Sequence, residues 1–119
     1  MSQSPDLPSL VQAAHRAVRE GRADEGRRLW ELVLARAPED PQALYVLGFL
    51  ALQRGAPATA RDYLKRSVAA RPDDKLAYMT LAVALRESGD IEGEAAALQA
   101  SLTVDPYFLP ALLSLGAYH

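Results

Sequence analysis

A period of 34 residues is the feature of this sequence that most limits its fold. Two kinds of helix-interrupting residue recur at this spacing: Pro38, Pro72 and Pro106, and Gly21, Gly55 and Gly89. Repetition at such a period is typical of arrays in which every unit is one supersecondary motif. The chain therefore divides into repeats over residues 7–40, 41–74 and 75–108, with a partial fourth repeat over 109–119.

Each repeat is predicted to form two helices. The first helices are expected over 8–20, 41–54 and 75–88, and the second helices over 23–36, 57–70 and 91–104. Apolar residues recur within them at three- and four-residue steps, as at Leu44, Leu47 and Leu50. A Gly ends each first helix, because Gly enters the left-handed conformation without steric cost. The Pro near each repeat end prevents the second helix from continuing.

Small residues mark the places where helices are expected to approach closely. One column of the first helices holds only small side chains: Ala14, Gly48, Ala82 and Gly116. Gly26 and Ala60 are expected to supply the opposing small surface in the second helices, and Trp30 to fill the space between layers. The third repeat departs from this pattern with Glu94, which must reach solvent or find a partner, because a buried unpaired charge is costly.

These positions together resemble the tetratricopeptide repeat. The second repeat carries the pattern best, with Leu44, Leu47-Gly48, Ala51, Ala60, Leu64 and Pro72. The resemblance implies an all-α solenoid of antiparallel helix pairs over residues 7–119, with three repeats and the first helix of a fourth. It also implies a concave groove, lined by the first helices, that holds a peptide or a partner's helix. Residues 1–6 would be a flexible N-terminus.

The same resemblance implies which side chains face a protein partner. They are Val11, His15, Arg19, Tyr45, Phe49, Leu52, Gln53, Met79, Val83 and Arg86, and Leu113 and Ala117 continue the stripe. The central part is apolar, which favours a binding site with Tyr45 and Phe49 as anchors. The alternative is that these residues are ordinary core, covered by a neighbouring helix or by a second copy. Both interpretations remain open at this stage.

Some members of the family hold the acidic tails of heat-shock chaperones with Lys, Asn and Arg side chains. At the corresponding positions this chain carries Val11, His15, Val46, Leu76 and Thr80. Because these residues lack the required cations and amides, binding of chaperone tails is not expected.

Composition argues against other classes of function. The net charge of −2 lacks the basic excess of a nucleic-acid-binding domain. Without Cys, with no His pair at ligand spacing and no phosphate-binding Gly loop, the sequence predicts no metal, no cofactor and no catalytic site. His15 lies near Arg16 and Arg19 and is interpreted as a polar surface residue.

The same composition bears on location. The longest apolar run, residues 43–52, is about half the ~20 residues needed to cross a bilayer. The N-terminus lacks the basic and apolar regions of a signal peptide. The prediction is therefore a cytoplasmic protein, and the preference for Arg over Lys points to a bacterial source.

The C-terminal end carries an apolar surface that solenoids normally cover with a polar cap. Its members are Leu109, Leu112, Leu113, Leu115 and Tyr118. The last helix is interpreted as a poor cap, as a surface for a homo-oligomer, or as part of a longer protein. Residues 89–113 resemble the repeats that precede an aspartyl/asparaginyl β-hydroxylase-type domain. This implies an alternative function as a non-catalytic module that recruits substrate to a 2-oxoglutarate dioxygenase.

Overall fold

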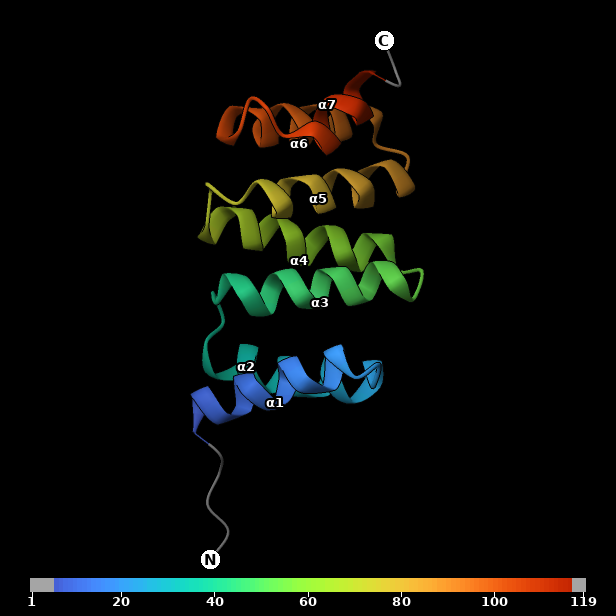
Figure 1. The fold of residues 1–119 in the computed structure, drawn as a ribbon. Helices are drawn as coiled ribbons and strands as arrows, with labels where there is room; N and C mark the ends of the chain where they lie inside the picture. Colours follow the sequence, from blue (N-terminus) through green and yellow to red (C-terminus); the bar gives the residue numbers. More distant parts are fainter. Residues whose placement is uncertain (1–5, 117–119) are drawn as a thin grey trace, which may run out of the picture.

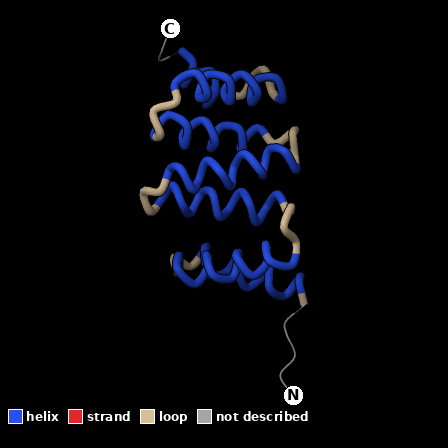
Figure 2. The backbone as a smooth tube through the Cα atoms, turned by 180° about the vertical axis from the view of Figure 1, so that it is seen from behind, coloured by secondary structure: helices blue, strands red, loops and turns tan. Residues whose placement is uncertain are grey.

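The computed structural model describes residues 6–116, and in that range it contains only helices (Figure 1, Figure 2). In chain order these are α1 (Leu7–Arg19), α2 (Ala23–Arg36), α3 (Pro41–Gln53), α4 (Pro57–Ala70), α5 (Lys75–Glu87), α6 (Ile91–Val104) and α7 (Leu109–Gly116). The all-α fold is confirmed, and every predicted helix boundary lies within one residue of the observed one. None of the helices in 6–116 is long and apolar enough to span a membrane.

The helices stack in chain order along one axis (Figure 1). Within each repeat α1 packs on α2, α3 on α4 and α5 on α6, while α2, α4 and α6 contact the helix that follows. The molecule is accordingly elongated, with principal extents of 60 × 26 × 22 Å. Because almost all tertiary contacts join neighbouring elements, this is the α-solenoid that the 34-residue period predicts.

Short polar side chains begin the first helices. Asp6, Asp40 and Asp74 accept hydrogen bonds from backbone N–H groups three residues on, which are the orphan donors of the first turn. Asp6, which the sequence assigned to the flexible N-terminus, is therefore the N-cap of α1. Its hydrogen bonds with Ser9 lower its pKa below the ordinary 3.8. Residues 1–5, the remainder of that predicted segment, lie outside the described range.

Glycine ends the first helices in the predicted way. Gly21, Gly55 and Gly89 have φ values of 81°, 79° and 84°, in the left-handed region that other residues enter at a steric cost. Each backbone therefore reverses within a few residues and returns as the second helix of the same repeat.

Apolar side chains form two core clusters along the stack. The first lies around Trp30, which is completely buried, and the second includes Leu64 and Leu98 at the equivalent positions of the next repeats. Two buried serines tie the second helices to the first. Ser67 Oγ donates to the Pro41 carbonyl at 2.9 Å, and Ser101 Oγ donates to the Lys75 carbonyl at 3.0 Å. The repeat period thus extends to hydrogen bonds within the core.

Small residues allow close packing where the two helices of a repeat meet. A Cβ atom added to Gly48 would lie 2.6 Å from Leu64 Cγ, and one added to Gly26 would lie 2.6 Å from Val18 Cγ2. A glycine of one helix is therefore opposed by a branched apolar side chain of the other. The atoms nearest to each glycine thus belong to a larger apolar side chain, because the missing Cβ makes room for it.

Glu94 keeps a carboxylate at the close contact of the third repeat. The residue is 3% exposed, and its Oε2 atom lies 3.9 Å from Arg86 Nε. The sequence left open whether Glu94 reaches solvent or finds a partner, and the structure shows that it pairs with Arg86.

Candidate protein-binding surface

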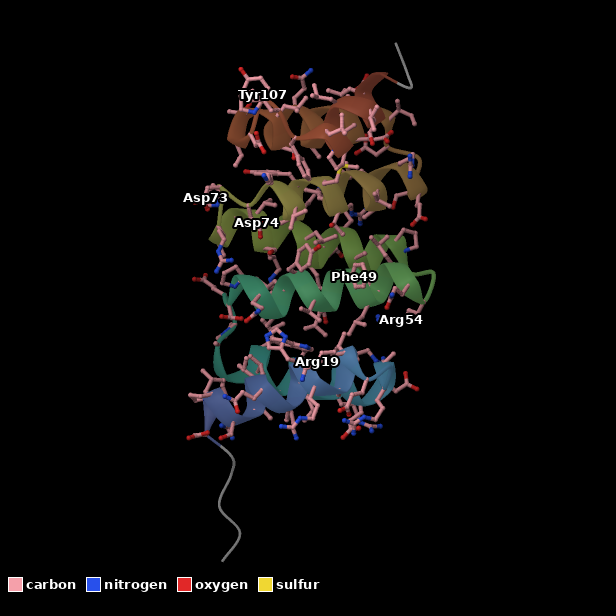
Figure 3. All side chains as sticks on the ribbon, in the orientation of Figure 1. Arg19, Phe49, Arg54, Asp73, Asp74 and Tyr107 are labelled. Carbon is pink, nitrogen blue, oxygen red and sulfur yellow. The ribbon has the colours of Figure 1, made fainter. Side chains whose placement is uncertain are left out.

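The predicted binding residues come from one side of the stack, the side formed by α1, α3 and α5. Because these helices start at equivalent points of successive repeats, residues 34 apart in sequence occupy equivalent places along it. Figure 3 shows Phe49 on α3 and Arg19 on α1 on this side. We call this side the first-helix face.

An apolar stripe occupies the middle of the first-helix face. It consists of Tyr45, Phe49, Leu52, Met79 and Val83. Phe49 is 41% exposed, whereas the other four side chains are half-buried. Tyr45, Leu52 and Met79 also pack against the second core cluster. The stripe thus combines side chains anchored in the core with one large aromatic ring open to solvent.

A hydrogen bond fixes the stripe across two repeats. Tyr45 Oη and Thr80 Oγ1 lie 3.3 Å apart, and Thr80 Oγ1 also donates to the Leu76 carbonyl at 2.9 Å. Thr80 therefore positions Tyr45. No spacing rule in the sequence singles out this pair, since it depends on how far α5 rotates relative to α3.

Val11 and His15 contribute less free surface than the sequence analysis implied. Val11 is half-buried and packs against the first core cluster. His15 is half-buried too, and its ring meets the Trp30 ring edge-to-face with centroids 4.9 Å apart. Aromatic pairs prefer this geometry. His15 therefore helps to cover the core at the N-terminal end of the face.

The polar residues among the predicted binding residues differ in their contacts. Arg19 is exposed at the end of α1, and Arg86 is exposed and pairs with the buried Glu94. Gln53 is exposed and, with Arg54, borders a shallow hollow of about 150 Å³ between α2 and α3. Another hollow, of about 200 Å³, involves Leu44 and Arg66 near the junction of the first two repeats. Neither hollow is lined by a residue of the apolar stripe.

Charges of opposite sign flank the apolar stripe. Arg19 and Arg54 lie at the C-terminal ends of α1 and α3, and Asp73 and Asp74 lie at the N-terminal end of α5 (Figure 3). The first helices all run in the same direction, so Arg19 and Arg54 lie at one edge of the face and Asp73 and Asp74 at the other, while Glu20 also ends α1 and Lys75 begins α5. The sequence analysis missed Arg54, although its position immediately before Gly55 places it at a helix end.

One junction carries a paired charge that stabilises the stack. Lys75 Nζ donates to Asp105 Oδ2 at 2.6 Å and lies 5.0 Å from the centre of the Phe108 ring. The hydrogen bond from Lys75, with a second from the Tyr107 N–H, lowers the pKa of Asp105 below its ordinary value of 3.8.

Within residues 6–116 no group of three or more His, Asp or Glu side chains is arranged to hold a metal ion.

Solved structures share this arrangement. MamA superposes with a TM-score of 0.89 at 19% identity, covering 94% of this chain and 66% of its own. The first tetratricopeptide domain of Spaghetti (RPAP3), bound to the HSP90 peptide SRMEEVD, gives 0.87 at 16% identity over 97% of this chain and 91% of its own. The O-GlcNAc transferase of Thermobaculum terrenum gives 0.79 at 28% identity, covering 92% of this chain and 22% of that enzyme.

Sequence comparison gives the same result. Cellulose synthase 2 operon protein C of Komagataeibacter xylinus is 35% identical over 102 residues, which are 84% of this chain and 8% of that protein. The chain thus spans a small part of its curated relative. These relatives lend no support to the resemblance to β-hydroxylase proteins. The family model for the tetratricopeptide repeat matches residues 11–75 and 50–107, most of the chain. With three helix pairs stacked at a 34-residue period, the chain belongs to the tetratricopeptide-repeat family.

Proposed function

We propose that this chain is a scaffold for protein–protein interaction whose partner lies on the first-helix face, over the apolar stripe. The proposal rests on the exposure of Phe49, which is 41% exposed among side chains that are anchored in the core. An exposed aromatic ring on a rigid support is the kind of residue that dominates binding energy at interfaces. Repeat arrays of this type use such extended surfaces for binding.

The flanking charges define the chemistry of the partner. An apolar segment that carries acidic residues toward Arg19 and Arg54 and basic residues toward Asp73 and Asp74 would complement both edges of the stripe. Charge complementarity of this kind fixes orientation and raises the association rate more than it raises affinity. The partner is therefore an amphipathic peptide or helix of defined direction.

The proposed partners do not include the acidic tails of heat-shock chaperones. The Spaghetti domain with its HSP90 peptide shares the fold at 16% identity. In this chain Val11 packs against the core and Thr80 is engaged with Tyr45 and Leu76. Neither side chain can take part in a carboxylate clamp of the kind that holds an acidic tail. A second copy of the chain, the other partner expected from the sequence, would use a different surface on α7.

Selection from a displayed library of random helical peptides tests the proposal. Peptides enriched on the wild-type chain should lose at least about tenfold in affinity when Phe49 is replaced by Glu, because a charge would then occupy the apolar contact. Leu32→Glu is the matched control, since Leu32 is 54% exposed and lies on α2. If the enriched peptides bind Phe49→Glu as well as they bind the control, the first-helix face is not the binding surface.

A further inference from the structure

The third repeat departs from the second at two positions that meet in space. On the first helix, Arg86 stands where the second repeat has Leu52, a member of the apolar stripe. On the second helix, Glu94 stands where the second repeat has Ala60, which is fully buried. Arg86 Nε and Glu94 Oε2 lie 3.9 Å apart. The two departures therefore form one paired change, because each introduces a charge that faces the opposite charge of the other.

This pair connects the core to the first-helix face. The Glu94 side chain is buried, whereas that of Arg86 is 46% exposed. The carboxylate thus lies beneath the surface, and the guanidinium reaches solvent in the last turn of α5. Val83 of the apolar stripe lies one helical turn earlier on the same side of α5. Arg86 therefore borders the stripe at the place where, one repeat earlier, Leu52 continues it.

The end of a helix does not by itself account for this arrangement. The helix dipole favours a cation near a C-terminus, which explains Arg19 and Arg54 at the ends of α1 and α3 as well as Arg86. The dipole does not require a carboxylate in the core, and burying one costs free energy that a long ion pair does not fully offset. The second repeat packs its two helices with Ala60 at that place. The paired charges are thus not needed for helix packing.

The exposed guanidinium has the chemistry of a carboxylate receptor. Its planar donors match the two oxygens of an Asp or Glu side chain. Glu94 lies on the buried side of Arg86, so a carboxylate that arrives from solvent would be nearer to the cation than to Glu94. Glu87 is exposed too, but adjacent residues of a helix point to different sides. The net attraction at this border of the stripe is therefore toward an acidic side chain.

We propose that Arg86 determines one feature of the partner's sequence, an Asp or Glu beside the apolar residues that bind over the stripe. This carboxylate pairs with the Arg86 guanidinium, which Glu94 supports from beneath. The proposal rests on the function proposed above, since it concerns the same first-helix face. An apolar residue at that point of the partner would desolvate the guanidinium without pairing with it, so the charge also selects against such partners.

The second repeat supplies the design of the test. The double variant Arg86→Leu, Glu94→Ala gives the third repeat the two residues that the second repeat carries, and it leaves neither charge buried alone. Peptides selected on the wild type from the displayed helical library should carry Asp or Glu at one fixed position relative to their apolar residues. Replacing that residue with Asn or Gln should weaken binding to the wild type about fivefold, and it should leave binding to the double variant nearly unchanged.

Circular dichroism establishes whether the double variant keeps its helices. If it does not, Arg86→Lys gives the comparison instead, because Lys keeps a charge beside Glu94 but lacks the planar donors. In Arg86→Lys the effect of replacing the acidic residue should fall to about twofold. The single variant Arg86→Leu is unsuitable, since it would leave Glu94 buried without its partner.

Phe49→Glu distinguishes failure of this proposal from failure of the proposed function. Peptides that lose binding to Phe49→Glu but carry no acidic residue at a fixed position overturn the role of Arg86 and leave the first-helix face as the binding surface. The same holds if replacing the acidic residue weakens binding to the wild type and to the variant equally. Peptides that bind Phe49→Glu as well as the wild type overturn both proposals.

Discussion

Replacing Gly48 with Ala tests the close contact on which the second repeat depends. An added Cβ would lie 2.6 Å from Leu64 Cγ, and 3.1 and 3.2 Å from its two Cδ atoms. Leu64 is fully buried, and Cγ is its branch point rather than a free end. The side chain cannot move away unless α4 moves too. The substitution therefore overfills a packed core.

Two opposing effects set the size of the change in stability. Overfilling a core typically costs about 1–3 kcal/mol. Replacing a Gly in a helix interior with Ala gains roughly 1 kcal/mol, because the unfolded chain loses freedom. The steric cost is the larger of the two. We expect a net loss of about 1 kcal/mol in the free energy of unfolding, or a midpoint about 4 °C lower.

The sign of this effect should reverse when Leu64 is shortened. Leu64→Ala alone is expected to cost about 2–5 kcal/mol, because it leaves a cavity. In that variant the atoms that the new Cβ would meet are absent. Gly48→Ala should then raise the free energy of unfolding by roughly 1 kcal/mol. Urea unfolding followed by circular dichroism on the four chains of this double-mutant cycle measures both changes.

A matched substitution separates packing from helix propensity. Gly116→Ala occupies the equivalent position of α7, where an added Cβ meets nothing. It should leave stability unchanged or raise it slightly. If Gly48→Ala stabilises the wild type as much as it stabilises Leu64→Ala, the reasoning is wrong, because Leu64 would then not fill the space beside Gly48.

Three further predictions concern groups described above. Ser67→Ala and Ser101→Ala should each lower the free energy of unfolding by about 1 kcal/mol, because each removes a buried hydrogen bond to a backbone carbonyl. Their effects should add in the double variant, since the two sites share no partner. Glu94→Met should raise the free energy of unfolding by about 1 kcal/mol in urea titrations, because it replaces a buried carboxylate, whose ion pair with Arg86 is long, 3.9 Å, with an apolar side chain of similar volume. A destabilised Glu94→Met would show that the carboxylate contributes to the fold. Asp105→Asn should be less stable than wild type above pH 3.8, and the difference should shrink as the pH falls below that value. The sign follows because Lys75 lowers the pKa of Asp105 in the folded chain, so the stabilisation is present above the ordinary pKa and is lost as the folded form is protonated.

The sequence predicts most of this fold because the determinants are local and repeated. Gly21, Gly55 and Gly89 stand where the backbone needs a positive φ, and their spacing alone fixes the repeat length. The apolar steps within each segment determine which side of each helix is buried. Neither property depends on knowing how distant parts of the chain meet.

The details of the site were harder to predict from the sequence, because they depend on distances between helices. Glu94 could have turned to solvent, but in the structure it is 3% exposed and lies 3.9 Å from Arg86. His15 and Phe49 occupy equivalent places on α1 and α3, 34 residues apart, but the first is half-buried and the second is exposed. The degree of burial depends on which side chains each residue meets, such as the Trp30 ring beside His15, and a residue pattern does not specify this.

Trp30 gives the molecule a built-in optical reporter of one of its parts. It is the only tryptophan in the chain, and it is completely buried beside His15 in the first core cluster. Its emission therefore monitors the N-terminal third, whereas ellipticity averages over every helix. Arrays whose units contact only their neighbours can lose cooperativity along their length. In an unlabelled sample, the difference between the midpoints of thermal unfolding by Trp30 emission and by ellipticity would then measure how strongly the unfolding of one repeat is coupled to that of the next.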